Sequence, residues 1–416
     1  MAKGNVKIAF VSFYPFEKGF FKSPHLNNKI VAVIASLITS IGYKRIRYIQ
    51  KHQNYFTDLM NEYNFLLKSK TMFKVKNEIY SWELSSPNNV LKSKKTDNKI
   101  FVIPTIEGAH VFNTGLTEYG SELNEQKILE NIQRIKSLKY PPLFITFAHN
   151  FNNDLCGHAP SLEPLKGLVD QRKNLDSGIS NLGHKVIREL LKNSHHNRIL
   201  IDIKHMSLES RLQYYKILEA EFNNSIPIIV SHGAVTGRRY SGKSVGTISP
   251  NLFANDSINF YDEELIKITN SKGLFAIQFD AKRLAPSNLI KKPILNGNKE
   301  KALENSTQIL WRQIQHVAET LDAESLPAWE TCCIGSDFDG TINPLNEIWT
   351  SEDFNKMANV LLYYAKDYLQ SPNTLKLQRN KLIDPETLVS NFCVNNVIRF
   401  MKECKKSNVR DYVLSS

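Results

Sequence analysis

Cysteine is scarce in this sequence: there are only five in 416 residues, an odd number, and no two form a C-x-x-C pair. The pattern argues against a disulfide framework and against a cysteine zinc cluster. We therefore expect reduced, mostly buried thiols and a cytoplasmic protein. The cysteines are Cys156, Cys332, Cys333, Cys393 and Cys404.

Long hydrophobic runs are also absent. The longest apolar stretch covers residues 30–41, which is too short to span a bilayer. The N-terminus has no apolar secretory segment followed by a small-residue cleavage site. These absences predict a soluble, intracellular protein with no membrane partner.

Negative charge is in deficit, since 53 Lys and Arg face 41 Asp and Glu, for a formal charge of +12. The basic residues are nevertheless spread along the chain. The densest cluster, residues 92–95, is expected to be a solvated loop between a helix and a strand. Nucleic acid is therefore not an expected partner.

Apolar residues, by contrast, are plentiful. They make up 42% of the chain and aromatic residues 10%, enough to form a large buried core. The sequence shows no linker and no short internal repeat. We predict a single domain over residues 1–416, of the size that β/α barrels commonly reach.

Several short apolar runs end in a residue able to bind metal or transfer a proton. In β/α barrels the active site lies at the C-terminal ends of the strands, so such residues would converge in space. Residues 101–106 precede Glu107, 143–148 precede His149, 199–204 precede His205, 226–231 precede His232, and 332–336 precede Asp337.

Helix-period segments separate these runs. Two more strands are expected, at residues 7–14 and 273–279, and a helical region covers most of 27–67. Ser207 and Asp384 are expected to cap helices. The prediction is an α/β fold, a TIM-type barrel with seven strands in place of eight, so that one strand is missing.

The motifs at these strand ends resemble the renal, or membrane, dipeptidase family of zinc-dependent hydrolases in the amidohydrolase superfamily. The resemblance extends over residues 7–402. It rests on Glu107-Gly108, His149, His205 and Ser231-His232 in that order, and most specifically on the G-S-D-F-D-G segment at 335–340.

The resemblance implies a role for each matching residue. Glu107 would bridge two zinc ions, and His205 and His232 would ligate one of them. His149 would contact the substrate carbonyl, while Asp337 would take a proton from the attacking water and pass it to the leaving amine. The implied substrate is a small peptide.

The chain departs from the family in its metal ligands. Members carry a His-x-His or His-x-Asp pair on a first strand, ahead of the strand that matches residues 7–14, and the sequence from Met1 leaves no room for that strand. What remains is Glu107, His205 and His232, a His₂Glu set typical of a mononuclear zinc site. We expect one zinc ion here where the family has two.

A second departure concerns the substrate carboxylate. Ile258 stands where renal-type members have an arginine, so Arg238 or Arg239 would have to take that role.

We expect a metal-dependent dipeptidase-like hydrolase. Two alternatives stay open: a catalytically impaired barrel protein, and an amidohydrolase acting on a lactone or a non-peptide amide. A homodimer is one of the open oligomeric states. His158 is expected in a surface loop.

Overall fold

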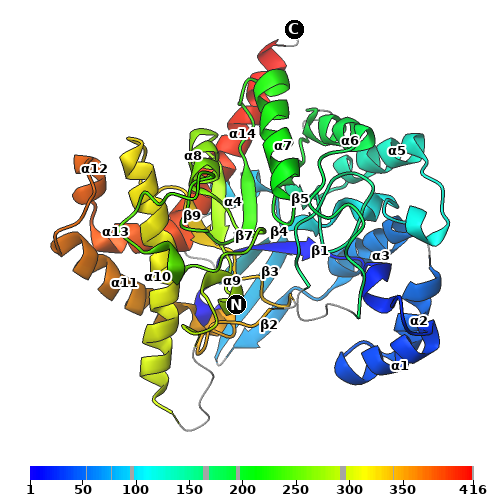
Figure 1. The fold of residues 1–416 in the computed structure, drawn as a ribbon, viewed down its shortest axis with the longest axis horizontal. Helices are drawn as coiled ribbons and strands as arrows, with labels where there is room; N and C mark the ends of the chain where they lie inside the picture. The colour runs from blue at the N-terminus through cyan, green and yellow to red at the C-terminus, as the bar shows by residue number, and fades with distance from the viewer. Residues whose placement is uncertain are drawn as a thin grey trace.

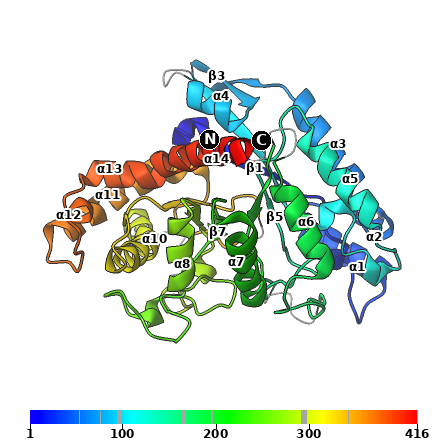
Figure 2. The same cartoon turned by 90° about the horizontal axis from the view of Figure 1, so that it is seen from above.

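The computed structural model describes residues 1–52, 54–75, 77–93, 98–162, 168–193, 197–290, 297–340 and 342–414 (Figure 1). Lys94 and Lys95 of the predicted solvated loop lie outside these ranges. A central sheet is surrounded by helices, and the chain runs once around it from the N-terminal to the C-terminal helices (Figures 1 and 2).

Seven parallel strands form the central part of the sheet, in the order β1-β4-β5-β6-β7-β8-β9. They occur at each of the seven predicted places, so the predicted barrel strands and the α/β class are confirmed. The strands are β1 (Ile8–Phe13), β4 (Lys99–Glu107), β5 (Phe144–Thr146), β6 (Leu200–Asp202), β7 (Ile229–Gly233), β8 (Leu274–Ile277) and β9 (Cys332–Ile334).

Two further strands continue the sheet and were not expected. β2 (Met72–Val75) and β3 (Glu78–Leu84) form an antiparallel pair, and β3 runs parallel to the beginning of β4. β4 is therefore long enough to pair with β3, with β1 and, at its C-terminal end, with β5.

The barrel is not closed by strand pairing in the described part of the chain. There, β1 pairs with β4 and β9 pairs with β8, while β1 and β9 do not pair with each other. This is the place at which an eighth strand would lie in a closed β/α barrel. The sheet thus has the TIM-type arrangement with the predicted gap.

The helical region expected at residues 27–67 consists of three helices, α1 (Asn28–Ile38), α2 (Tyr43–Lys51) and α3 (Tyr55–Lys68). The others cover the sheet between strands. They are α4 (Pro87–Lys92), α5 (Glu125–Lys136), α6 (Asn181–Leu191), α7 (Leu208–Phe222), α8 (Asp262–Asn270), α9 (Ala281–Leu284), α10 (Lys299–Ala323), α11 (Phe354–Gln370), α12 (Gln378–Lys381), α13 (Pro385–Ser390) and α14 (Asn396–Leu414).

Both predicted helix caps are present. The Ser207 hydroxyl accepts from the Ser210 amide at the start of α7, and the Asp384 carboxylate accepts from the Thr387 amide at the start of α13. The terminal helix is not continuous, because one π-helical turn at Asn391–Asn395 separates α13 from α14.

The largest apolar core joins side chains from Phe13 to Cys404 around the sheet. Four of the five cysteines are buried, and all five are free thiols. In the described part of the chain, no helix combines the length and the apolar content needed to cross a bilayer. The single domain expected over residues 1–416 stays a prediction.

Candidate active site

All five predicted site residues lie at the same edge of the sheet. Glu107 is the last residue of β4 and His232 lies within β7. His149, His205 and Asp337 each come three residues after the last residue of β5, β6 and β9. Because the strands are parallel, their C-terminal ends meet at one edge.

The three predicted metal ligands point toward one another. Glu107 Oε1 lies 3.7 Å from His232 Nε2 and 3.9 Å from His205 Nε2, and the two Nε2 atoms are 3.1 Å apart. Tetrahedral ligands around one zinc ion are about 3.3 Å apart, given metal–ligand bonds of about 2 Å. This geometry fits one divalent cation.

A buried carboxylate orients His232 through a hydroxyl. Ser231 Oγ donates to Asp202 Oδ2 at 2.5 Å and lies 2.8 Å from His232 Nδ1. The Thr146 hydroxyl donates to the same carboxylate oxygen. Because Nδ1 is engaged in this way, the Nε2 lone pair of His232 is directed at Glu107. In many metal sites the ligating histidine is likewise held by a hydrogen bond to its other ring nitrogen.

His205 and Asp337 share an unusual backbone conformation. Their φ angles are +66° and +56°, in the left-handed region that non-glycine residues seldom adopt. Such strain concentrates at functional sites, where the surrounding structure holds it. Among the described residues, the buried Nδ1 atom of His205 has no hydrogen-bond partner.

Gly108, directly after Glu107, also needs a left-handed conformation, with φ of +96°. A Cβ atom there would lie 2.3 Å from His110 Nδ1 and 3.4 Å from the Cβ of His149. Only glycine therefore fits the turn that directly follows Glu107, beside His110 and His149.

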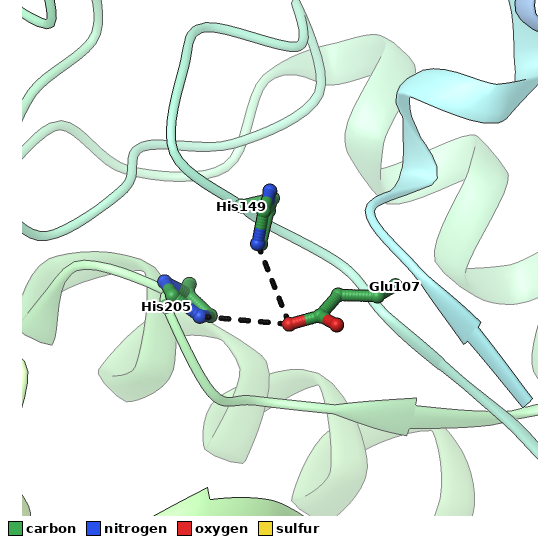
Figure 3. Close-up of side chains that lie close together, drawn as sticks. All are labelled: Glu107, His149 and His205. Atoms are coloured by element: carbon green, nitrogen blue, oxygen red, sulfur yellow. Dashed lines mark ion pairs between the residues drawn. The ribbon is translucent and has the colours of Figure 1, made fainter. Parts of the chain in front are cut away.

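His149 lies between two carboxylates. Its Nδ1 is 2.5 Å from Glu17 Oε2, and its Nε2 is 3.4 Å from Glu107 Oε1. Figure 3 shows the imidazoles of His149 and His205 on one carboxylate oxygen of Glu107. Glu17 also accepts from the Tyr14 hydroxyl and the Phe151 amide, so it is fixed in place.

The two kinds of histidine differ in charge. Burial lowers the pKa of His149, but Glu17 and Glu107 outweigh it and raise that pKa to about 10. Burial lowers the pKa of His232 to about 3 and that of His205 well below its ordinary value. His205 and His232 are therefore neutral, the form that binds a metal, whereas His149 is an imidazolium.

The two carboxylates of the site also differ. Burial opposes the ionisation of Glu107, but His149 and His232 outweigh it and lower its pKa to about 2. Burial and the charge of Glu107 raise the pKa of Asp337 well above its ordinary value. Asp337 is thus the more basic of the pair, as a proton acceptor should be. Its ligand atom also lies within 4.8 Å of those of Glu107 and His232, so it could contact the same cation.

Two cations act on the site, Lys204 from the loop after β6 and Arg283 from helix α9. The charge of Lys204 lowers the pKa of Glu107 and Asp337, and the charges of Lys204 and Arg283 both contribute to the low pKa of His205. Lys204 is buried, and burial lowers its own pKa to about 7. The Arg283 guanidinium is 2.9 Å from Asp256.

The arginines proposed from the sequence are engaged elsewhere. Arg239 forms an ion pair with Glu324 at 2.5 Å, and Arg238 donates to the Asn251 side chain. Both belong to the segment after β7. A role for them in binding the substrate carboxylate stays a prediction, and Lys204 and Arg283 are the cations that the structure brings to the predicted site residues.

Sequence reasoning missed three polar residues of the site: Glu17, Asp202 and Lys204. Asp202 and Lys204 lie in the run before His205, where a carboxylate and an ammonium inside an apolar strand were the available signal. Glu17 gave no signal. The expectation for His158 was wrong, because its side chain is fully buried and bonds to backbone carbonyls of Ala159 and Lys173.

A parallel β/α sheet whose strand ends carry three histidines, a glutamate and an aspartate defines the class of metal-dependent hydrolases. Within that class, the model of the membrane dipeptidase family, peptidase family M19, matches residues 70–408. The chain belongs to this family of hydrolytic enzymes, which confirms the family predicted from the motifs. No curated protein matches the chain.

Solved structures show the same fold. A metallopeptidase described as dipeptidase AC of family M19 is 12% identical, with a TM-score of 0.55 over 97% of this chain and 87% of its own. A metallopeptidase from Rhodobacter sphaeroides, liganded with a phosphinate mimic of L-Ala-D-Ala, has 12% identity, a TM-score of 0.54 and coverages of 97% and 88%. An amidohydrolase from Pseudomonas aeruginosa has 12% identity, a TM-score of 0.50 and coverages of 97% and 91%.

Proposed function

We propose that the chain is a zinc-dependent dipeptidase that cleaves the peptide bond of small peptides. The observation that supports this most is the convergence of two neutral imidazole nitrogens, from His205 and His232, on one oxygen of Glu107. These atoms come from the ends of three different strands, and neutral imidazole with carboxylate is a donor set that suits zinc.

One cation is proposed, held by Glu107, His205 and His232. When bound, a divalent cation supplies a Lewis acid that polarises the scissile carbonyl and makes water a stronger nucleophile. The Nε2 atoms of His205 and His232 both face Glu107, and His232 contacts Ser231 through its other nitrogen, so both Nε2 atoms are available for such a cation.

The protein groups divide the proton work between them. Asp337, with its raised pKa, accepts a proton from the attacking water and later delivers it to the leaving amine. His149, held as an imidazolium by Glu17, donates from Nε2 toward the oxygen that gains charge as the carbonyl is attacked.

The sequence lacks the arginine that binds the substrate carboxylate in the family. We propose that Lys204 and Arg283, which place positive charge near His205, attract the carboxylate of the peptide instead. A small peptide is the substrate class that the family implies. The five free cysteines support a cytoplasmic location as part of the proposal.

Metal content and hydrolysis in the same preparations test the proposal. The parent chain, purified without chelator and supplied with zinc, is expected to hold about one zinc per chain and to hydrolyse dipeptides. His205→Ala and His232→Ala are expected to lose both properties. His25→Ala, which removes an exposed imidazole from a loop, is the matched control and should keep them.

The alternatives give different outcomes. Zinc binding without hydrolysis of any dipeptide would support the catalytically impaired protein. Hydrolysis of lactones or non-peptide amides alone would support the other amidohydrolase function. Equal zinc content in the parent, His205→Ala and His232→Ala would overturn the metal site itself.

A further inference from the structure

Helix α1 exposes an unusual number of apolar side chains. Ile30, Val33, Ile34, Leu37 and Ile38, together called the α1 face here, are between 43% and 80% exposed. Their spacing places them on one side of the helix over consecutive turns. α1 lies at the margin of the molecule in both views, and it carries most of the longest apolar run of the sequence (Figures 1 and 2).

The opposite side of α1 is already used for packing. Ala32 and Ala35 are buried in a small cluster with Phe21 and with Ile46 and Ile49 of α2. The α1 face is therefore additional apolar surface, beyond what the fold needs. Single exposed apolar residues are common, but a contiguous set on one helix indicates a surface that binds another apolar surface.

The charges along the segment that carries this face have one sign. Between Glu17 and Asp58 the sequence contains no acidic residue and seven Lys or Arg. Of these, Lys29 of α1 and Lys44 and Lys51 of α2 are exposed. The first acid that follows, Asp58, is buried and lies 3.8 Å from Arg45 and 3.9 Å from His52, so it does not give the surface a negative charge.

We propose that α1 and α2 together bind the surface of a bilayer that contains anionic lipids. Aliphatic side chains on one face of a helix, with basic residues beside them, are what an interfacial helix uses: the apolar face enters the acyl boundary and the cations meet the headgroups. Tyr43 and Tyr48 of α2 are also exposed, and tyrosine favours this boundary.

Charge favours a membrane over a second copy of the chain. Two α1 faces packed together would bring two copies of this acid-free, basic segment close to each other, and such like charges oppose association. The expectation of no membrane partner was based on the short apolar run, which excludes a spanning helix and leaves surface binding open.

The proposed surface is connected to the active site through a short segment. The Gln50 side chain of α2 donates to the carbonyls of Phe21 and Asn28, which joins α1, α2 and the 3-10 turn Lys18–Phe21. That turn directly follows Glu17, which holds His149. The proposed membrane-binding surface is thus directly connected to Glu17, the residue that orients His149.

Vesicle sedimentation of the full chain tests the proposal. Binding is expected to vesicles of phosphatidylcholine with phosphatidylserine, to weaken as salt is raised, and to be far weaker with phosphatidylcholine alone. Ile34→Ser with Leu37→Ser should reduce binding about tenfold or more. Lys44→Glu with Lys51→Glu should do so too, since each basic residue near the headgroups contributes about fivefold.

Matched controls are available on other helices. Phe65→Ser removes an exposed apolar residue of α3, and Lys402→Glu with Lys405→Glu reverses two exposed charges of α14, and neither should change binding. Thermal melting confirms that each variant is folded. No binding by a folded parent, or equal binding to neutral and anionic vesicles, would overturn the proposal. So would a dimer in sedimentation velocity that the α1 variants dissociate while vesicle binding is absent.

Discussion

Two histidines of the site have a carboxylate behind them, and the manner of contact decides their charge. Glu17 touches His149 directly, and the pKa of His149 rises to about 10. Asp202 reaches His232 only through the Ser231 hydroxyl, and burial leaves His232 neutral, with a pKa of about 3. One arrangement thus produces a hydrogen-bond donor and the other a metal ligand.

Asp337→Asn separates the chemical step from metal binding. The amide keeps the shape of the side chain and can still accept a hydrogen bond, but it cannot take a proton from water. Loss of one general base costs about 10²–10⁴-fold in rate. We therefore expect a fall of this size in kcat for dipeptide hydrolysis, with zinc content unchanged. Unchanged kcat would exclude the proton-transfer role, and loss of zinc would show that Asp337 is itself a ligand.

Lys204→Met tests recognition of the substrate carboxylate. Methionine keeps much of the length and the apolar stem of lysine but removes the charge next to His205. We expect KM for dipeptides to rise about tenfold, the loss of one charged hydrogen bond. For the matching dipeptide amides, which lack the carboxylate, the variant and the parent should have similar KM. Equal KM ratios for acids and amides would contradict the role.

At the scale of elements, the sequence was sufficient for the strands that carry the site. Buried parallel strands are continuous apolar runs, so β1 and β4 to β9 could be found and their polar C-terminal residues singled out. Their lengths were less predictable: β5, β6 and β9 have three paired residues each, and the rest of each run is loop that carries the site residue.

The antiparallel pair β2 and β3 was missed because it does not follow the strand-helix alternation. Its residues are almost all exposed or half-buried, so they lack the apolar continuity of a core strand. The helices between the strands were easier to predict than this extension, because each repeats apolar residues at helical spacing.

The predicted site residues converge, but part of their support could not be inferred. Glu107, His205 and His232 were recognisable because each ends an apolar run. Glu17 lies in the segment after β1, 132 positions from the His149 that it contacts, and no local pattern links the two. Contacts of this kind depend on the tertiary structure alone.

At the scale of the whole molecule, a helix lies where strand pairing is absent. In the described part of the chain β1 and β9 do not pair, yet α14 contacts β8 and β9 on one side and α4, which precedes β4, on the other. Figure 2 shows α14 running across the sheet toward α4 and β1. The two ends of the sheet are therefore joined by helix packing around the apolar core.

The candidate metal site joins distant parts of the same sheet, which predicts that metal binding and global stability are linked. The ligands lie at the C-terminal ends of β4, β6 and β7, so only the folded chain presents them together. A cation that binds the native state at a hundred times its dissociation constant stabilises it by about 2.7 kcal/mol. With an unfolding entropy of about 2.1 cal/mol/K per residue, this corresponds to a rise in Tm of about 3 °C for a chain of this length.

Calorimetry with and without zinc, after treatment with chelator, measures this shift. His232→Ala should show no rise in Tm with zinc, because it removes a ligand. Asp337→Asn should show the full rise if Asp337 is only a proton acceptor, and a smaller one if it also contacts the cation. If zinc raises the Tm of the parent and of His232→Ala equally, the stabilising zinc binds elsewhere. A site that joins three strand ends cannot lose one imidazole ligand and still stabilise the whole fold to the same extent.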